Sequence, residues 1–208
     1  MSQPPTIECR PNGPYVVKDL EDLRRSDGGV IPTKPVSALC RCGGSANKPF
    51  CDRTHLTNGF SDAKLTEGKG DRRQDYVGRR ITIHDNRAIC AHAGRCTDGL
   101  SAVFKYGSEP WIDPNGAEVA AIVETIRKCP SGALSYSVEE VEHRDVAGKP
   151  AITVSKDGPY EVTGGVTLID QKWGEGASTE HFTLCRCGGS RNKPFCDGTH
   201  WSLGFKDG

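Results

Sequence analysis

The stretch CRCGGSANKPFCDRTH, from Cys40 to His55, places three cysteines and one histidine within 16 residues. The chain repeats it as CRCGGSRNKPFCDGTH from Cys185 to His200, and 14 of the 16 residues are unchanged. Cysteine and histidine are the ligands that soft and borderline metals prefer. The paired glycines within each stretch allow the loop to fold around such a metal. The sequence therefore predicts two equivalent metal sites.

The repeat extends beyond the two cysteine-rich stretches. TIECRPNGPYVV at 6–17 aligns with AITVSKDGPYEV at 151–162, and this pair has the same offset of 145 residues (185 minus 40) as the cysteines. A constant offset means that each unit has no net insertion. We therefore predict a first unit over residues 1–63, a different segment with flanking linkers over 64–149, and a second unit over 150–208. We expect the Gly-Pro-Tyr segment of each unit, with the strand after it, to pack the two units together.

The composition favours small domains held by cross-links. Hydrophobic residues make up 35% of the 208 residues, and 25 glycines and 13 prolines indicate many turns. Domains with so little apolar material usually need disulfides or metals, and the chain has ten cysteines. Because the chain begins MSQPPTIECR, without a secretory signal, we expect a reducing, cytoplasmic location, where grouped cysteines are metal ligands more often than disulfides.

The charges exclude two classes of partner. Lysine and arginine number 27, as do aspartate and glutamate, so the net charge is zero. We therefore expect no nucleic acid and no acidic membrane as a partner. No apolar run approaches the roughly 20 residues of a membrane span.

Two other interpretations of the repeated stretch stay open at this point. The cysteines could form disulfides, or a Cys₃His set could hold a structural zinc ion. Zinc sites usually have two to four residues between paired cysteines, whereas Cys40 and Cys42 have one. The tight spacing therefore fits zinc less well than it fits another centre.

Both stretches resemble the CDGSH iron–sulfur signature, in which Cys-x-Cys is followed by a serine or threonine, a proline, Cys-Asp-Gly and a histidine. The resemblance implies a [2Fe–2S] cluster in each unit. One iron of each cluster would be held by two cysteines, and these are Cys40 and Cys42 in the first unit and Cys185 and Cys187 in the second. The other iron would be held by Cys51 and His55 in the first unit and by Cys196 and His200 in the second. Known members of the family pair two such units, so the resemblance also implies a β-rich pseudo-dimer within one chain.

The first unit departs from the signature at one position. The signature glycine is present as Gly198, but its equivalent in the first unit is Arg53. If this position has a positive φ angle, Arg53 is strained, and if it lies in a helical turn, arginine is harmless. We expect both units to bind a cluster.

The middle segment contains a third group of cysteines, Cys90, Cys96 and Cys129, in CAHAGRC and CPSGAL. Alternation predicts a strand over residues 79–85, and a stripe of apolar residues predicts a helix over 115–128. The three cysteines could simply be buried in a small core. However, Cys-Pro after a helix resembles the closing motif of a bacterial-type ferredoxin, and the resemblance covers about residues 75–138.

A ferredoxin would have a further cysteine where this chain has Ala93. Three thiolates favour a [3Fe–4S] cluster, whereas a [4Fe–4S] cluster would need a different fourth ligand, for which His92 is the nearest candidate. The remaining candidates have no partner at ligand spacing. We expect Cys9 to be a strand residue and His84, His143 and His181 to lie in packing or surface positions.

Together these features predict an α+β fold in which two β-rich CDGSH units form an intrachain pseudo-dimer around a ferredoxin-like insert. The expected function is one-electron transfer or redox sensing, with a redox protein or an apo-protein cluster acceptor as partner and the chain itself as a monomer. Cluster storage or transfer, and a zinc-stapled interaction module, are the alternatives. The sequence has no phosphate-binding loop, nucleophile elbow or carboxylate pair, so we do not expect an enzyme.

Overall fold

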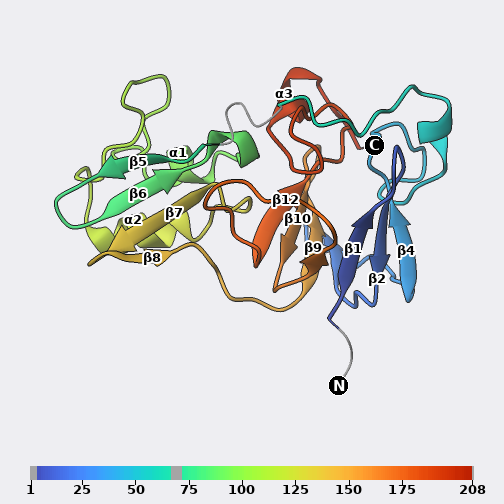
Figure 1. Cartoon of the computed structure of the whole chain (residues 1–208), viewed down its shortest axis with the longest axis horizontal. Coiled ribbons are helices and arrows are strands. Elements are labelled where there is room, and N and C mark those ends of the chain that lie inside the picture. The colour runs from blue at the N-terminus through green and yellow to red at the C-terminus, as the bar shows by residue number, and fades with distance from the viewer. Residues whose placement is uncertain (1–3, 67–71, 208) are drawn as a thin grey trace.

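The computed structural model describes residues 4–66 and 72–207. Their strands form three four-stranded sheets, in the orders β11-β1-β2-β4, β12-β10-β9-β3 and β5-β6-β7-β8. Figure 1 shows the third sheet at one end of the molecule, the second in the middle and the first at the other end. The middle segment of the chain therefore lies beside the second repeat unit.

The two repeat units have the same strand pairing. Each contains three antiparallel strands, which are β1 (Thr6–Cys9), β2 (Tyr15–Lys18) and β4 (Val36–Leu39) in the first unit and β9 (Ala151–Val154), β10 (Tyr160–Thr163) and β12 (His181–Leu184) in the second. Ile7 pairs with Val17, and Ile152 pairs with Val162 in the same register. The constant offset of the sequence is thus reproduced in the hydrogen bonding.

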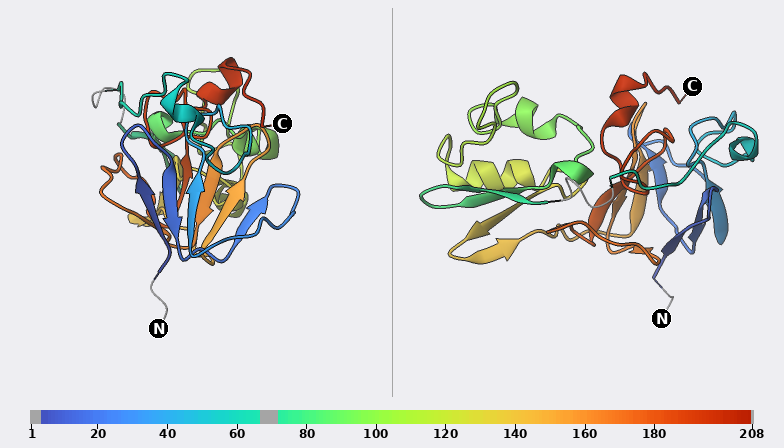
Figure 2. Two further views of the ribbon diagram at one scale, coloured as in Figure 1. Left: turned by 90° about the vertical axis from the view of Figure 1, so that its right-hand side faces the viewer. Right: turned by 45° about the horizontal axis from the view of Figure 1, so that its top comes forward.

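Each unit also adds a short strand to the sheet of the other. Strand β3 (Leu23–Arg25) of the first unit pairs in parallel with β9, and β11 (Thr167–Leu168) of the second unit pairs in parallel with β1. Figure 2 shows strands of the two units side by side in a second view. This exchange of strands makes the units an intrachain pseudo-dimer, as the resemblance implied.

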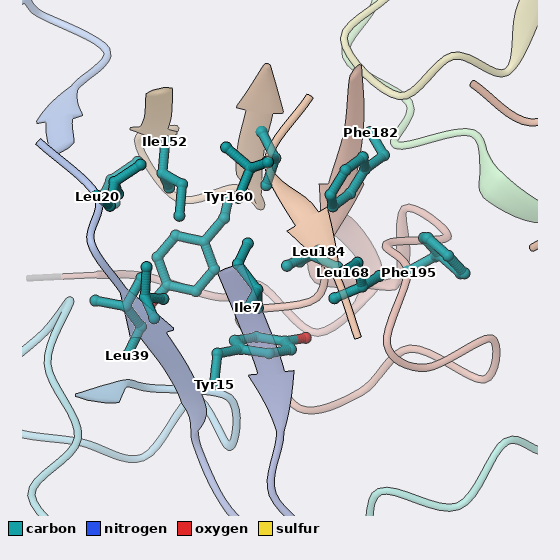
Figure 3. Close-up of a cluster of buried hydrophobic side chains, with 14 of the residues drawn as sticks. Ile7, Tyr15, Leu20, Leu39, Ile152, Tyr160, Leu168, Phe182, Leu184 and Phe195 are labelled. Atoms are coloured by element: carbon teal, nitrogen blue, oxygen red, sulfur yellow. The ribbon is translucent and has the colours of Figure 1, made fainter. Parts of the chain in front are cut away.

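A single hydrophobic core lies between the two units, as Figure 3 shows. Its centre contains Tyr15 and Tyr160, whose side chains are fully buried. Their rings meet edge to face with centroids 6.0 Å apart, a preferred arrangement for aromatic pairs. The Gly-Pro-Tyr segments therefore do pack the units together.

The middle segment forms an α+β domain with a separate core. Its sheet consists of β5 (Gln74–Val77), β6 (Thr82–Asp85), β7 (Leu134–Val138) and β8 (Val141–His143), and its helical elements are η2 (Arg87–Ile89), α1 (Arg95–Gly99) and α2 (Val119–Ile126). The predicted helix over 115–128 is shorter in the structure, because a turn closed by the Gly116 N–H and the Asp113 carbonyl precedes it. Ile122 and Ile126 bury the apolar stripe.

The polar stretch over residues 64–75 was expected to be a linker. Strand β5 takes its last two residues, and residues 67–71 lie outside the described residues. Each repeat unit has one helical turn, η1 (Thr54–Leu56) and α3 (Thr199–Ser202), which begins three residues after its third cysteine. In the part of the chain that the structure describes, no helix has both the length and the apolar character needed to cross a bilayer.

Candidate metal centres

The predicted ligands of each repeat unit lie in two pairs. In the first unit the Sγ atoms of Cys40 and Cys42 are 3.9 Å apart, and Cys51 Sγ lies 3.4 Å from His55 Nδ1. The corresponding distances in the second unit are 3.8 Å between Cys185 and Cys187 and 3.5 Å between Cys196 and His200. Both units therefore present the same arrangement of donors.

These distances fit one tetrahedral metal per pair. Metal–sulfur bonds of about 2.3 Å and metal–nitrogen bonds of about 2.0 Å place two sulfurs about 3.8 Å apart, and a sulfur and a nitrogen about 3.5 Å apart. Among residues 4–66 and 72–207, no three His, Cys, Asp or Glu side chains converge as they would on a single ion. The donor set thus suits two metals held by two pairs better than one metal held by four ligands.

Hydrogen bonds fix the loop that carries the ligands. In the first unit Ser45 Oγ donates to the Phe50 carbonyl at 2.7 Å, and the Asp52 carboxylate accepts from the Ala46 and Thr54 N–H groups at 2.8 and 3.0 Å. The second unit repeats these bonds. Backbone N–H groups also approach the ligand sulfurs, at 3.4 Å from Gly189 N to Cys187 Sγ. Such donors disperse the negative charge of a bound thiolate.

Each tyrosine of the core holds the ligand loop of the opposite unit. The Tyr15 hydroxyl lies 2.9 Å from the carbonyl oxygen of Cys185, and the Tyr160 hydroxyl lies 3.0 Å from that of Cys40. In both cases a proline carbonyl of the same loop is also within 3.1 Å. The position of one metal site therefore depends on the other unit.

The two ligand loops also touch each other directly. A Cβ atom on Gly43 would lie 2.4 Å from the Cys187 carbonyl oxygen, and one on Gly188 would lie 2.6 Å from that of Cys42. Contacts this short with backbone atoms leave no room for a side chain. The first glycine of each stretch is therefore required by the contact between the units.

The two sites differ in their exposure. Cys196 and His200 are buried, with 3% and 5% of their surface exposed, whereas Cys51 and His55 are half-buried. Burial raises the pKa of the Cys196 thiol and lowers the pKa of the His200 imidazole, to which the nearby His92 also contributes. The difference arises because the middle domain covers only the second site.

The structure shows whether the position of Arg53 has a positive φ angle. Its φ angle is 73°, and that of Gly198 is 83°, so both residues have the left-handed conformation. Arginine adopts this conformation at a cost of about 1 kcal/mol, and Arg53 is therefore strained. The Arg53 N–H still lies 3.4 Å from Cys51 Sγ, as the Gly198 N–H lies 3.5 Å from Cys196 Sγ. The arginine strains the turn but keeps its geometry.

The three cysteines of the middle domain line one cavity of about 460 Å³. Cys90 and Cys129 pack against the core of the repeat units, and Cys96 and Cys129 pack against the core of the middle domain. Burial raises the pKa of Cys90 to about 11, and the neighbouring Cys129 adds to the shift. The three predicted thiols thus line a space that could hold a cluster, although they are not placed to bind one single ion together.

The residues that line this cavity include His92, which was predicted, and Asp85, which was not. His92 has a φ angle of 53°, and its ring lies against Gly198 of the second unit. Asp85 was not predicted as a ligand, because its separation from the cysteines in the sequence matches no ligand motif. It is 3% exposed, its Oδ1 has no hydrogen bond among the described residues, and burial raises its pKa to about 6.

The arginine between the first two cysteines of each stretch was also missed. Arg186 is 1% exposed, and its guanidinium donates to the Gly158 and Ser155 carbonyls and to Asp207. Arg41 is 4% exposed in the equivalent position. A buried arginine with such partners fixes the position of a loop. The signal in the sequence was the arginine between the first two cysteines of both stretches.

The remaining candidates have packing roles. Cys9 lies in β1, as expected. His84 is buried and hydrogen bonded to Asp75 and Ser137, both at 2.7 Å. His181 is buried beside Ser178, and His143 stacks on a tyrosine ring.

Comparison with known proteins finds family matches in three separate segments of the chain. The family model described as "Iron-binding zinc finger CDGSH type" matches residues 12–56 and 157–201, and the one described as "Divergent 4Fe-4S mono-cluster" matches residues 76–139. The chain is 44% identical over 61 residues to the uncharacterized protein YjdI of Escherichia coli K12, and equally to the protein of that name from E. coli O157:H7. These alignments cover 29% of this chain and 80% of each relative.

No solved structure matches the chain. The two family models nevertheless match the segments in which the ligand pairs and the cysteine-lined cavity lie. The chain belongs to the CDGSH iron-binding family, and a divergent 4Fe–4S mono-cluster domain lies between its two CDGSH domains.

Proposed function

We propose that this protein is a one-electron carrier with a [2Fe–2S] cluster in each CDGSH unit and a third iron–sulfur cluster in the middle domain. The observation that carries the proposal is the division of each ligand set into a Cys–Cys pair and a Cys–His pair, each spaced for one metal. An iron–sulfur cluster supplies reversible one-electron chemistry when it is bound. The proposal assigns no catalytic reaction to the chain.

The residues around each CDGSH site support a role in electron transfer. Backbone N–H groups directed at the ligand sulfurs stabilise the added negative charge of a reduced state. Replacing one thiolate by a neutral imidazole lowers the charge at the site and raises its reduction potential above that of an all-cysteine site. Since the loops are fixed by the serine, aspartate and tyrosine hydrogen bonds, little rearrangement would accompany the change of charge.

The cavity of the middle domain supports a third cluster. Three thiolates are sufficient for a [3Fe–4S] cluster, and a [4Fe–4S] cluster would take a fourth ligand from the same cavity. Asp85 and His92 are two non-cysteine side chains there with suitable chemistry, alongside Cys90, Cys96 and Cys129. Burial of these thiols raises the pKa of Cys90 and of Cys96, so metal binding must displace their protons.

Iron and acid-labile sulfide counting, with EPR of the oxidised and reduced protein, tests the proposal. We expect a red-brown protein whose visible absorption bleaches with dithionite. About four irons per chain would indicate an empty middle domain, about seven a [3Fe–4S] cluster and about eight a [4Fe–4S] cluster. A colourless protein with stoichiometric zinc would overturn the proposal in favour of a zinc-stapled module.

The exposure of the first site favours cluster transfer as a second function. Cys51 and His55 are half-buried, and Asp52 and Arg53 between them are exposed, so an incoming thiolate could reach the site. Incubation of the loaded protein with an apo-ferredoxin tests this function. Growth of the ferredoxin absorption, with loss of the first site before the second, is the expected result, and simultaneous loss of both sites contradicts it.

A further inference from the structure

The cysteine loop of the middle domain docks onto the ligand loop of the second CDGSH unit. The Trp201 indole Nε1 donates to the His92 carbonyl at 3.1 Å, and the Asn192 side-chain amide donates to the Ala88 carbonyl at 2.8 Å. Ala88 and His92 lie on either side of Cys90 in the sequence. The contact therefore joins one candidate centre to another.

Segments that carry ligands of the two centres meet at this contact. The His92 ring lies against Gly198, which is two residues after Cys196 and two residues before His200. Figure 1 shows the same relationship, with the middle domain beside the strands of the second unit and the first unit on the far side.

The contact depends on Gly198. A Cβ atom at this position would lie 2.4 Å from His92 Cδ2, so the imidazole ring rests directly on the glycine backbone. The equivalent residue of the first unit is Arg53, which is exposed. Its turn has the same conformation but is open to solvent at this position. The two repeated stretches differ at two positions, and the second of these, Arg53 against Gly198, thus lies at the docking surface.

From these contacts we infer that the middle domain and the second CDGSH site form an internal electron-transfer pair, joined where His92 meets the turn at Gly198 and Trp201. The inference rests on the proposed function. One electron leaves the centre of the middle domain, which is oxidised, and enters the second CDGSH centre, which is reduced, with no bond made or broken. Imidazole ligation favours this direction, because replacing a thiolate by a neutral imidazole raises the potential of the CDGSH centre.

The first CDGSH site is more exposed than the second. Its Cys51 and His55 are half-buried, and the surrounding Asp52, Arg53 and Leu56 are exposed. The two CDGSH centres are therefore unequal. The second is reached from the middle domain, and the first is reached from solution.

EPR relaxation of the dithionite-reduced protein tests the inference. Both CDGSH centres are paramagnetic after reduction, and a cluster in the middle domain is too. We expect two equal populations of [2Fe–2S] signal, of which one relaxes faster because of the nearby third centre. Gly198→Ala should abolish the fast-relaxing population, since its Cβ displaces His92.

The matched control is Gly204→Ala, which adds a Cβ at another positive-φ glycine of the second unit with nothing within 4 Å of it, and should leave both populations unchanged. Trp201→Phe, which removes only the indole donor, provides a second and milder variant if Gly198→Ala loses its iron. The electron transfer itself is followed by stopped-flow reduction with dithionite, in which Gly198→Ala and Trp201→Phe should slow one of the two CDGSH phases.

The outcomes separate the inference from the proposed function. Absence of iron and sulfide would overturn both. Full iron content with a single relaxing population, or about four irons per chain, would overturn the internal pair while leaving the CDGSH centres as electron carriers. Equal effects of Gly198→Ala and Gly204→Ala would also overturn it, because backbone strain would then be sufficient to explain them.

Discussion

Tyr15 and Tyr160 meet edge to face at the centre of the molecule, with their ring planes at 85°, and each holds the metal-binding loop of the opposite unit through its hydroxyl group. Because both rings are fully buried, water cannot take the place of either partner if one of these hydrogen bonds is lost. The two sites are thus braced across the interface rather than within their own units.

The bracing predicts crossed effects of mutation. Tyr15→Phe removes the donor to the loop of the second site, and Tyr160→Phe removes the donor to the loop of the first. Each should cost about 1–2 kcal/mol in stability, because buried carbonyls lose a partner. Chelator-induced iron loss, followed by EPR, should be faster at the second site for Tyr15→Phe and at the first for Tyr160→Phe. Faster loss within the mutated unit would contradict the crossed bracing.

The close contact of the ligand loops predicts a strong effect at Gly43. Alanine there places a Cβ atom 2.4 Å from the Cys187 carbonyl oxygen. Gly59→Ala is the control, because Gly59 also has a positive φ angle, 72°, but has nothing within 4 Å of its Cβ position. The control should cost about 1 kcal/mol from backbone strain alone. Gly43→Ala should lower the melting temperature considerably more and reduce the iron content of both sites, and equal effects would contradict the contact.

The strained turn at Arg53 predicts a stabilising substitution. Arg53→Gly places a residue that tolerates the positive φ angle of 73° in this turn. Within residues 4–66 and 72–207 the arginine side chain makes no hydrogen bond that the substitution would remove. We expect a gain of up to about 1 kcal/mol, which differential scanning calorimetry would detect as a rise of about 2–4 °C. A lower melting temperature would show that the arginine side chain stabilises the first unit.

Asp85 predicts a stability that depends on pH. Its folded pKa of about 6 lies above the ~3.9 of an exposed aspartate, so the folded protein holds the proton more tightly than the unfolded chain. The stabilisation from this proton is complete below about pH 4 and is lost as the pH rises through about 6. Asp85→Asn should therefore be more stable than the parent by about 2 kcal/mol near pH 7.5, and by less near pH 5.

Thermal unfolding of the loaded protein at both pH values measures this difference. Asp113→Asn is the control in the same domain, because a hydrogen bond from Lys105 lowers the pKa of that exposed carboxyl. The control should show no gain near neutral pH. A loss of iron from Asp85→Asn with no gain in stability would indicate that the carboxylate instead belongs to the centre of the middle domain.

Much of this architecture could be predicted from the sequence because short local patterns determine it. The constant offset predicts the matched register of β1 with β2 and of β9 with β10. The resemblance to the CDGSH signature implies the Cys–Cys and Cys–His pairs that the structure brings together. The apolar stripe predicts helix α2. Its early start was wrong because Asp113 and Gly116 close a turn that propensity alone does not indicate.

Long-range features could not be predicted. The exchanged strands β3 and β11 have three and two residues, too few to show an alternating pattern, and their pairing is decided by the other unit. The docking of the middle domain onto the second unit depends on the path of the chain between them. Asp85 was missed for a similar reason, since only the fold brings it to the cavity of the cysteines.

The exchange of β3 and β11 has a consequence for how such a protein can change. In a dimer of identical chains, every substitution occurs twice, once on each side of the two-fold axis. Here both halves are encoded separately, while the shared sheets prevent either half from leaving the other. One half was thus free to accept Arg53 and keep an open turn, while the other kept Gly198 and received a domain. Fusion with strand exchange allows a symmetric scaffold to hold two sites that differ in access.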